Sequence, residues 1–166
     1  MTKLMTARVA VMLSTAACVM ALMSTVTATL STARAGDGKQ LEGSWVVTTT
    51  IPGDPNSPFK SLATINGDGT FVESLQPGLN PLVSDVHGVW TRTGKRDFAT
   101  TGVYLRSDGA GNFVGTTKVL AILTLSKTLD EGSARFQADL FDPAGNPVGS
   151  FTGTSQISRI KVEQLD

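Results

Sequence analysis

The sequence predicts an all-β protein, a single antiparallel up-and-down barrel of eight strands preceded by a signal peptide. From Leu41 onward, runs of β-branched and aromatic residues alternate with clusters of Gly, Pro, Asp and Asn at the spacing of β-hairpins. No part of this region shows a convincing 3.6-residue apolar period, so no substantial helix is expected. A sheet that closes on itself leaves no exposed edge strand, which favours a barrel over an open sheet.

The N-terminal segment has the pattern of a cleavable export signal. Lys3 and Arg8 precede an almost wholly apolar run over residues 9–23. A Ser- and Thr-rich stretch then leads to Ala33-Arg34-Ala35, the small-x-small pattern that a signal peptidase recognises. We therefore expect residues 1–35 to be removed and the rest of the chain to be exported, to a periplasm or to the extracellular space.

The sequence allows two other fates for this segment. A retained membrane anchor is disfavoured, because the apolar run falls short of the roughly 18–20 residues that span a bilayer. Lipidation of Cys18 is the second alternative, since Ala16 and Ala17 precede it, although Thr15 stands where a lipoprotein signal usually has Leu.

Removal of the signal changes the composition of the remaining domain, residues 36–166. All five methionines and the single cysteine, Cys18, lie in the signal, so the domain has no thiol for nucleophilic chemistry, a disulfide or a metal site. Three of the 14 basic residues but none of the 14 acids leave with the signal, so the domain is mildly acidic. This charge offers no electrostatic case for binding nucleic acid, and no stable membrane insertion is expected after cleavage.

The predicted strands follow one another with turn residues between them. They are expected over residues 41–50, 59–66, 70–75, 86–92, 97–106, 112–126, 133–142 and 148–162. Asn66-Gly67-Asp68-Gly69 supplies residues that tolerate a positive φ in a tight hairpin. Similar turns are expected at residues 93–95, 108–111 and 142–147. Two longer Pro- and Asn-containing loops, residues 52–58 and 77–81, are expected at the barrel ends.

The side-chain pattern differs between two of the later strands. In strand 133–142, small and apolar residues alternate with polar ones, as expected when one face of the strand is buried. In strand 112–126, Val119–Leu123 is apolar on both faces, which predicts a covered outer face. The cover would be a loop, the N-terminal segment or a second copy, so a homo-oligomer through this sixth strand is one expected partner.

A short motif occurs twice near the end of the chain. Residues 111–116 and 149–154 both read G-x-F-x-G-T. The second glycine of each is expected to leave a gap where the strand coils sharply or where a neighbouring aromatic ring packs.

The first and last strands carry the residues of a family resemblance. Gly43-Ser44-Trp45 opens the first strand and Arg159 lies on the last, and these strands are neighbours in a closed barrel. The guanidinium can stack on the indole and donate to backbone carbonyls there. This arrangement resembles the lipocalins and the wider calycin group, and it implies a lipocalin-like barrel closed by Gly43, Trp45 and Arg159. The turn motifs together with His87-Gly88-Val89-Trp90 are most similar to uncharacterised exported bacterial barrels, a likeness that implies a fold and no activity.

The first functional hypothesis is a non-enzymatic binding module for a small, largely apolar ligand in the barrel mouth. Trp45, Trp90 and Tyr104 would form the walls, because they combine apolar rings with polar tips. His87 would be the polar anchor. No catalytic residue, cofactor or metal is expected, because the chain has no G-x-S-x-G elbow and only one histidine.

Two other hypotheses stay open at this stage. One is a cyclase- or isomerase-like barrel enzyme that uses His87, with Asp85 on the same face of the strand. The other is a structural or inhibitory module that acts through its surface near Val119–Leu123. The interior of an eight-stranded barrel is either filled by side chains or hollow, and the sequence leaves this choice open.

Overall fold

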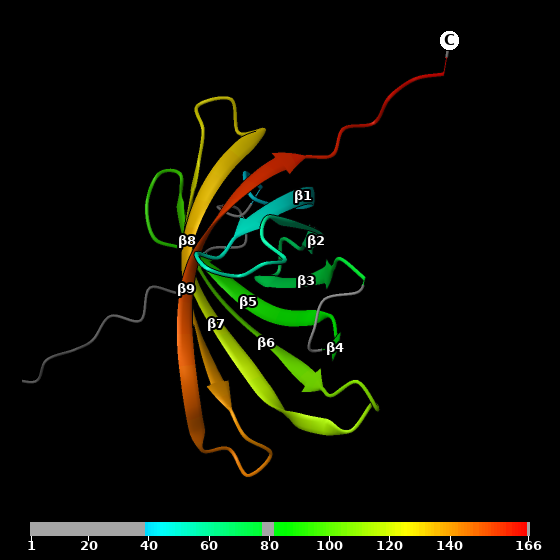
Figure 1. Ribbon diagram of the computed structural model, residues 1–166. Coiled ribbons are helices and arrows are strands. Elements are labelled where there is room, and N and C mark those ends of the chain that lie inside the picture. Colours follow the sequence, from blue (N-terminus) through cyan, green and yellow to red (C-terminus); the bar gives the residue numbers. More distant parts are fainter. Residues whose placement is uncertain (1–38, 78–81, 166) are drawn as a thin grey trace, which may run out of the picture. The chain divides into compact units, whose positions relative to one another are not determined.

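The computed structural model describes residues 39–77 and 82–165, and all regular structure within them is β-strand (Figure 1). The predicted signal peptide, with Cys18, and most of the predicted loop 77–81 lie outside the described residues. The strands are β1 Gly43–Thr50, β2 Phe59–Ile65, β3 Thr70–Leu75, β4 Leu82–Val83, β5 Val86–Arg92, β6 Asp97–Ser107, β7 Phe113–Leu125, β8 Glu131–Phe141 and β9 Pro147–Arg159. In the part of the chain described, no helix is long and apolar enough to cross a membrane.

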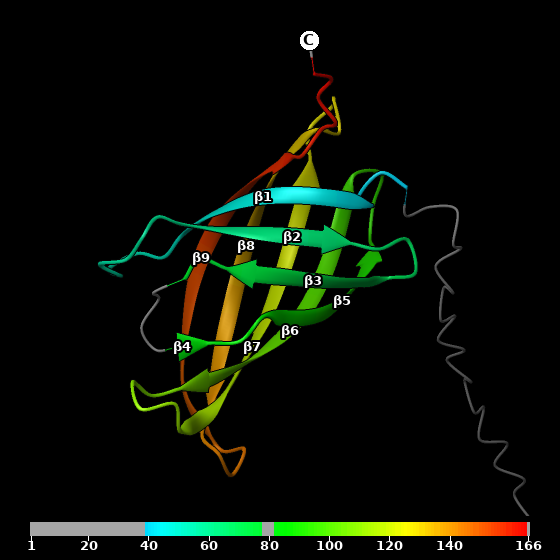
Figure 2. The same ribbon diagram turned by 90° about the vertical axis from the view of Figure 1, so that its right-hand side faces the viewer.

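Eight of these strands form a closed antiparallel barrel, which confirms the predicted fold class. Neighbours in the sequence pair with each other from β1 round to β9, with β4 left out of the wall, and β9 pairs back with β1 (Figure 2). Closure brings Trp45 of β1 directly opposite Arg159 of β9. The short strand β4 was not expected from the sequence; it pairs with the far end of β6, Leu82 opposite Ser107.

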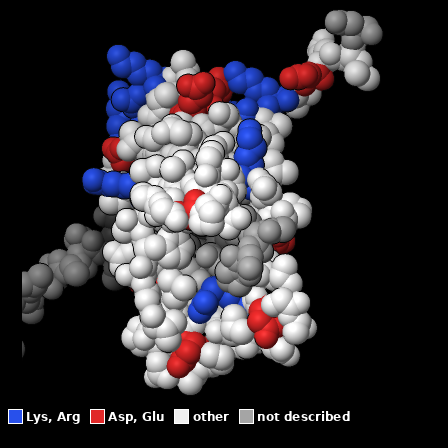
Figure 3. Space-filling model, viewed as in Figure 1, with Lys and Arg blue, Asp and Glu red and all other residues white. Residues whose placement is uncertain are grey.

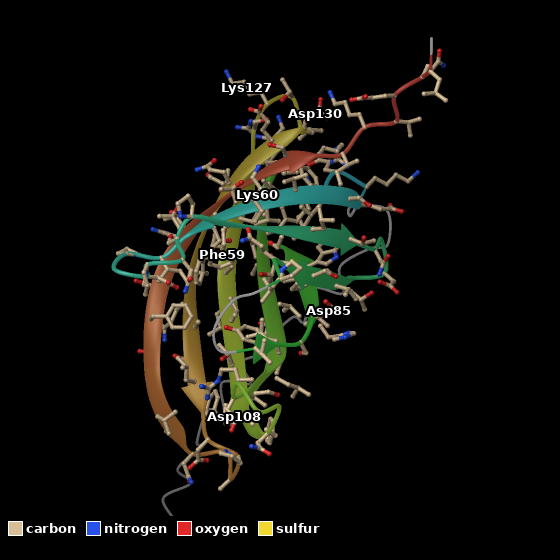
Figure 4. All side chains as sticks on the ribbon, turned by 45° about the vertical axis from the view of Figure 1, so that its right-hand side comes forward. Phe59, Lys60, Asp85, Asp108, Lys127 and Asp130 are labelled. Carbon is tan, nitrogen blue, oxygen red and sulfur yellow. The ribbon has the colours of Figure 1, made fainter. Side chains whose placement is uncertain are left out.

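The two ends of the barrel are built differently. One end holds the hairpin turns at residues 66–69, 93–96 and 126–130 together with the start of β1, and we call it the Arg159 end. The other holds the connections at residues 51–58, 108–112 and 142–146, and we call it the Asp108 end. Figure 4 shows Lys127 and Asp130 at the first of these ends and Asp108 at the second.

The hydrophobic core lies toward the Arg159 end. Its most deeply buried large side chains are Leu41, Trp45, Phe98 and Leu125. Phe98 meets the ring of Trp90 edge-on, with ring centroids 5.7 Å apart.

The glycines of the repeated motif occupy close-packed positions, as their spacing predicts. A Cβ atom at Gly153 would lie 2.5 Å from Cζ of Phe136, so the phenyl ring takes the place that a side chain would fill. Gly115 has a φ of +129° and lies against the carbonyl of Phe141, beside an irregular step in the pairing of β6 with β7. Both glycines therefore permit contacts that a larger residue would block.

On the outer face of β7, two apolar side chains are exposed within the described residues. Leu120 and Ile122 point outward and are 40% and 50% exposed. No described loop covers them. Val119, Ala121 and Leu123 point inward, so the apolar run is divided between the two faces of one strand.

Candidate functional site

The barrel interior is hollow. A cavity of about 150 Å³ lies inside it, and every one of the eight barrel strands contributes to its lining. Its aromatic walls are formed by Trp45, Phe59, Phe71, Trp90, Tyr104, Phe136 and Phe151. The choice between a filled and a hollow barrel, which the sequence left open, is therefore decided by the structure.

Side chains alternate between the two faces of each strand, and this alternation places the lining residues in the barrel interior. In β2, Phe59, Ala63 and Ile65 are buried, whereas the intervening Lys60 and Leu62 are exposed. Successive side chains on a strand point to opposite faces, so one face of each strand lines the cavity and the other forms the outer wall.

The two tryptophans present ring surface to the cavity and use their N–H groups elsewhere. The indole N–H of Trp45 donates to the carbonyl of Leu41 at 3.0 Å, and that of Trp90 donates to the carbonyl of Asn66 at 3.0 Å. Both acceptors belong to the Arg159 end. The tryptophans therefore offer apolar walls to a ligand, and its polar contacts have to come from other residues.

A carboxyl group lies among these apolar walls. Glu73 lies on β3 between the inward-pointing Phe71 and Leu75, and it lines the cavity. The Ser61 hydroxyl of the neighbouring strand donates a hydrogen bond to one of its oxygens. Burial raises the pKa of Glu73 above its usual value, and the hydrogen bond from Ser61 opposes this shift.

The remaining polar groups of the lining are uncharged. Thr49 and Ser155 face each other across β1 and β9, and their hydroxyls hydrogen-bond at 3.0 Å. Tyr104 is the only other titratable side chain among the described lining residues, and burial raises its pKa. No described Lys, Arg or His lines the cavity, so Glu73 is the single acidic or basic side chain among the described lining residues apart from the Tyr104 phenol.

The structure divides the residues singled out from the sequence into two groups. Trp45, Trp90 and Tyr104 line the cavity, but His87 is exposed on the outer face of β5. The physical reason is strand periodicity: His87 and Trp90 are three residues apart, and an odd spacing places them on opposite faces. Asp85 is exposed as well. His87 therefore lies outside the cavity, and the expectation that it anchors a ligand beside the aromatic walls is wrong.

Glu73 was missed at the sequence level although a signal was present. It stands in phase with Phe71 and Leu75 on a strand whose bounds were predicted correctly. An acidic residue in the apolar phase of a strand points to a buried, functional carboxyl. Ser61 carries the same signal more weakly, in phase with Phe59 and Ala63.

The three residues assigned to barrel closure meet at the Arg159 end. The guanidinium carbon of Arg159 lies 4.1 Å from the centre of the Trp45 ring. Its nitrogens donate to the carbonyls of Gln40 and Glu42, each at 2.6 Å, and to that of Leu129 at 3.1 Å. A Cβ atom at Gly43 would lie 2.7 Å from Nη1 of Arg159, which explains why glycine opens this strand.

Among residues 39–77 and 82–165, no cluster of three or more His, Cys, Asp or Glu side chains is placed to hold a metal ion.

Comparison with known proteins adds no family assignment. No protein-family model matches this chain, and no curated protein matches it in sequence.

Proposed function

We propose that this chain is an exported, non-enzymatic binding protein that holds a small, largely apolar ligand inside its barrel. The hollow interior carries the proposal. Protein interiors are normally packed to the density of organic crystals, and an empty cavity lowers stability by about 24 cal/mol per Å³, or about 4 kcal/mol for this volume. A ligand that fills the space recovers part of this free energy.

The size and lining of the cavity limit the ligand to about one ring. An apolar cavity of about 150 Å³ engineered into another protein takes up benzene. Here seven of the 23 lining residues are aromatic, which favours offset or edge-on contacts with a ligand ring. Export is supported by the sequence of residues 1–35 and not by the barrel itself.

Filling the cavity with protein atoms tests the proposal. Ala121 lines the cavity from β7, so Ala121→Leu introduces three carbon atoms into the space that a ligand needs. We expect toluene to raise the melting temperature of the unsubstituted protein and to quench or shift the fluorescence of Trp45 and Trp90, the only tryptophans of the chain. In Ala121→Leu both responses should be lost.

Two variants serve as controls. Ala99→Leu makes the same change on the outer face of β6, where Ala99 stands opposite Ile122. His87→Ala removes the exposed imidazole of β5. Both should keep the response to toluene. Absence of a saturable response in the unsubstituted protein would contradict a binding function, and loss of binding in His87→Ala would restore this residue to the site.

A further inference from the structure

We propose that the cavity selects ligands that carry a protonated amine beside their single ring, with Glu73 as the counter-ion. The inference rests on the proposed binding function and specifies its ligand class. It follows from the position of one carboxyl in an otherwise uncharged and largely apolar lining.

The placement of Glu73 leaves it available to a ligand. Glu73 points inward from the middle of β3, opposite Ala63 on one side and Val86 on the other. Neither neighbour offers a charge. Within the described residues, the Ser61 hydroxyl is the one group that hydrogen-bonds the carboxyl, so Glu73 ties no loop or distant segment to the barrel.

The charge of the lining discriminates between ligand classes. A carboxyl in an apolar interior is unfavourable when ionised and unpaired, and an ammonium group supplies the missing partner. A ligand that carries a carboxylate would bring a second negative charge next to the first. The rings of Phe71, Trp90 and Tyr104, which line the same cavity, also attract a cation through their faces.

Selection of an amine makes binding depend on pH in a defined direction. Burial favours the protonated form of Glu73 in the free protein, so binding of an ammonium ion releases this proton. The affinity for an amine should therefore increase as pH rises through the raised pKa of Glu73. Tyr104 is the other titratable group of the described lining, and its raised pKa keeps it a neutral phenol over this range.

The test compares two ligands of the same shape. Benzylamine and benzyl alcohol differ in the group attached to the same ring, and only the amine is charged at neutral pH. We expect the unsubstituted protein to bind benzylamine at least about tenfold more tightly than benzyl alcohol, as measured by titration of tryptophan fluorescence. In Glu73→Gln the preference should disappear through loss of amine affinity, with the affinity for benzyl alcohol unchanged within about threefold.

The variant Glu73→Gln and its control Glu131→Gln both remove a negative charge and keep the size and shape of the side chain. Glutamine keeps an oxygen that accepts the hydrogen bond from Ser61, so Glu73→Gln removes the charge and leaves the shape. Glu131→Gln makes the same change at the exposed start of β8 and should leave both affinities unchanged. The pH dependence of amine binding is measured on the unsubstituted protein and provides a second readout that needs no variant.

The outcomes separate the inference from the function on which it rests. Binding of benzyl alcohol without a preference for benzylamine overturns the role of Glu73 and leaves the binding function standing. A preference that survives in Glu73→Gln, or an amine affinity that falls as pH rises, also overturns it. Absence of binding for both ligands and for toluene overturns the proposed function itself.

Discussion

Arg159 shows how one side chain joins segments that are far apart in the sequence. It donates to the carbonyls of Gln40, Glu42 and Leu129 and lies over the ring of Trp45. Gln40 and Glu42 precede β1 and Leu129 follows β7, so the guanidinium joins the last strand to both segments. A planar group with several fixed donors is suited to this task, and an ammonium group is not.

Replacement of this guanidinium should lower stability. We expect Arg159→Lys to lower the free energy of unfolding by about 2 kcal/mol, because one ammonium cannot reach all three carbonyls or stack in the same way. Denaturant unfolding measures this as a lower midpoint with an unchanged slope. Arg135→Lys, at an exposed position on β8, is the matched control and should change stability by less than about 0.5 kcal/mol. Equal effects of the two substitutions would contradict the role of Arg159.

At the scale of elements, two connections at the Asp108 end have the same sequence pattern and the same internal hydrogen bonds. Residues 108–112 and 142–146 both read D-x-A-G-N, and the leading Asp accepts hydrogen bonds from the backbone N–H and the side chain of the final Asn. In both loops the Gly before the Asn has a positive φ, +84° and +86°. An Asp that binds its own turn and a Gly that permits a positive φ are the residues that such loops require. Each loop thereby sets the register of the two long strands that it joins.

These loops predict a particular dependence of stability on pH. The hydrogen bonds from Asn112 and Asn146 lower the pKa of Asp108 and Asp142. A carboxyl whose pKa is lower in the folded state stabilises the fold above its unfolded pKa of about 3.9, and this contribution is lost as pH falls further. We therefore expect the free energy of unfolding of the double variant Asp108→Asn/Asp142→Asn to fall less steeply in acid than that of the unsubstituted protein.

Unfolding curves measured at a series of acidic pH values test this prediction. Asp85→Asn is the control, because Asp85 is exposed (Figure 4) and its carboxylate accepts no hydrogen bond in the described structure. It should retain the acid dependence. A double variant that follows the unsubstituted protein at every pH would show that the two turns make no pH-dependent contribution.

At the scale of the whole molecule, the outer wall is unusually apolar on one side. Val89, Val103, Leu105, Leu120 and Ile122 are each at least 40% exposed, and they lie on the adjacent strands β5, β6 and β7. Figure 3 shows one face of the molecule, on which charged side chains gather toward the top and the bottom and few lie between. Exposed apolar patches on soluble domains often mark contact surfaces.

The expected homo-oligomer through β7 stays a prediction and has a direct test. If two copies meet at this wall, sedimentation should show association that increases with protein concentration. Leu120→Lys places a charge in the middle of the patch and should shift the equilibrium to the monomer. Lys60→Leu, which removes a charge from the outer face of β2 well away from β7, should not produce this shift. A monomer at every concentration would contradict the prediction.

Part of the candidate site could be predicted from the sequence because its signals are local. Trp45 and Trp90 stand in the apolar phase of predicted strands, and together with Tyr104 they line the cavity. The same periodicity excludes His87, which is out of phase with Trp90, and includes Glu73, which is in phase with Phe71 and Leu75. The extra strand β4 had no local signal, because two residues become a strand only where the chain returns to the end of β6.

The sequence by itself determined the class, number and order of the barrel strands, because alternation, turn residues and edge closure depend on neighbours along the chain. It also determined that Trp45 and Arg159 would meet, since the first and last strands of a closed barrel are adjacent. Only the tertiary structure decided that the barrel is hollow and that Glu73 is a lone carboxyl inside it. A cavity is the difference between the space enclosed by eight strands and the summed volume of their inward side chains, and no single segment contains that quantity.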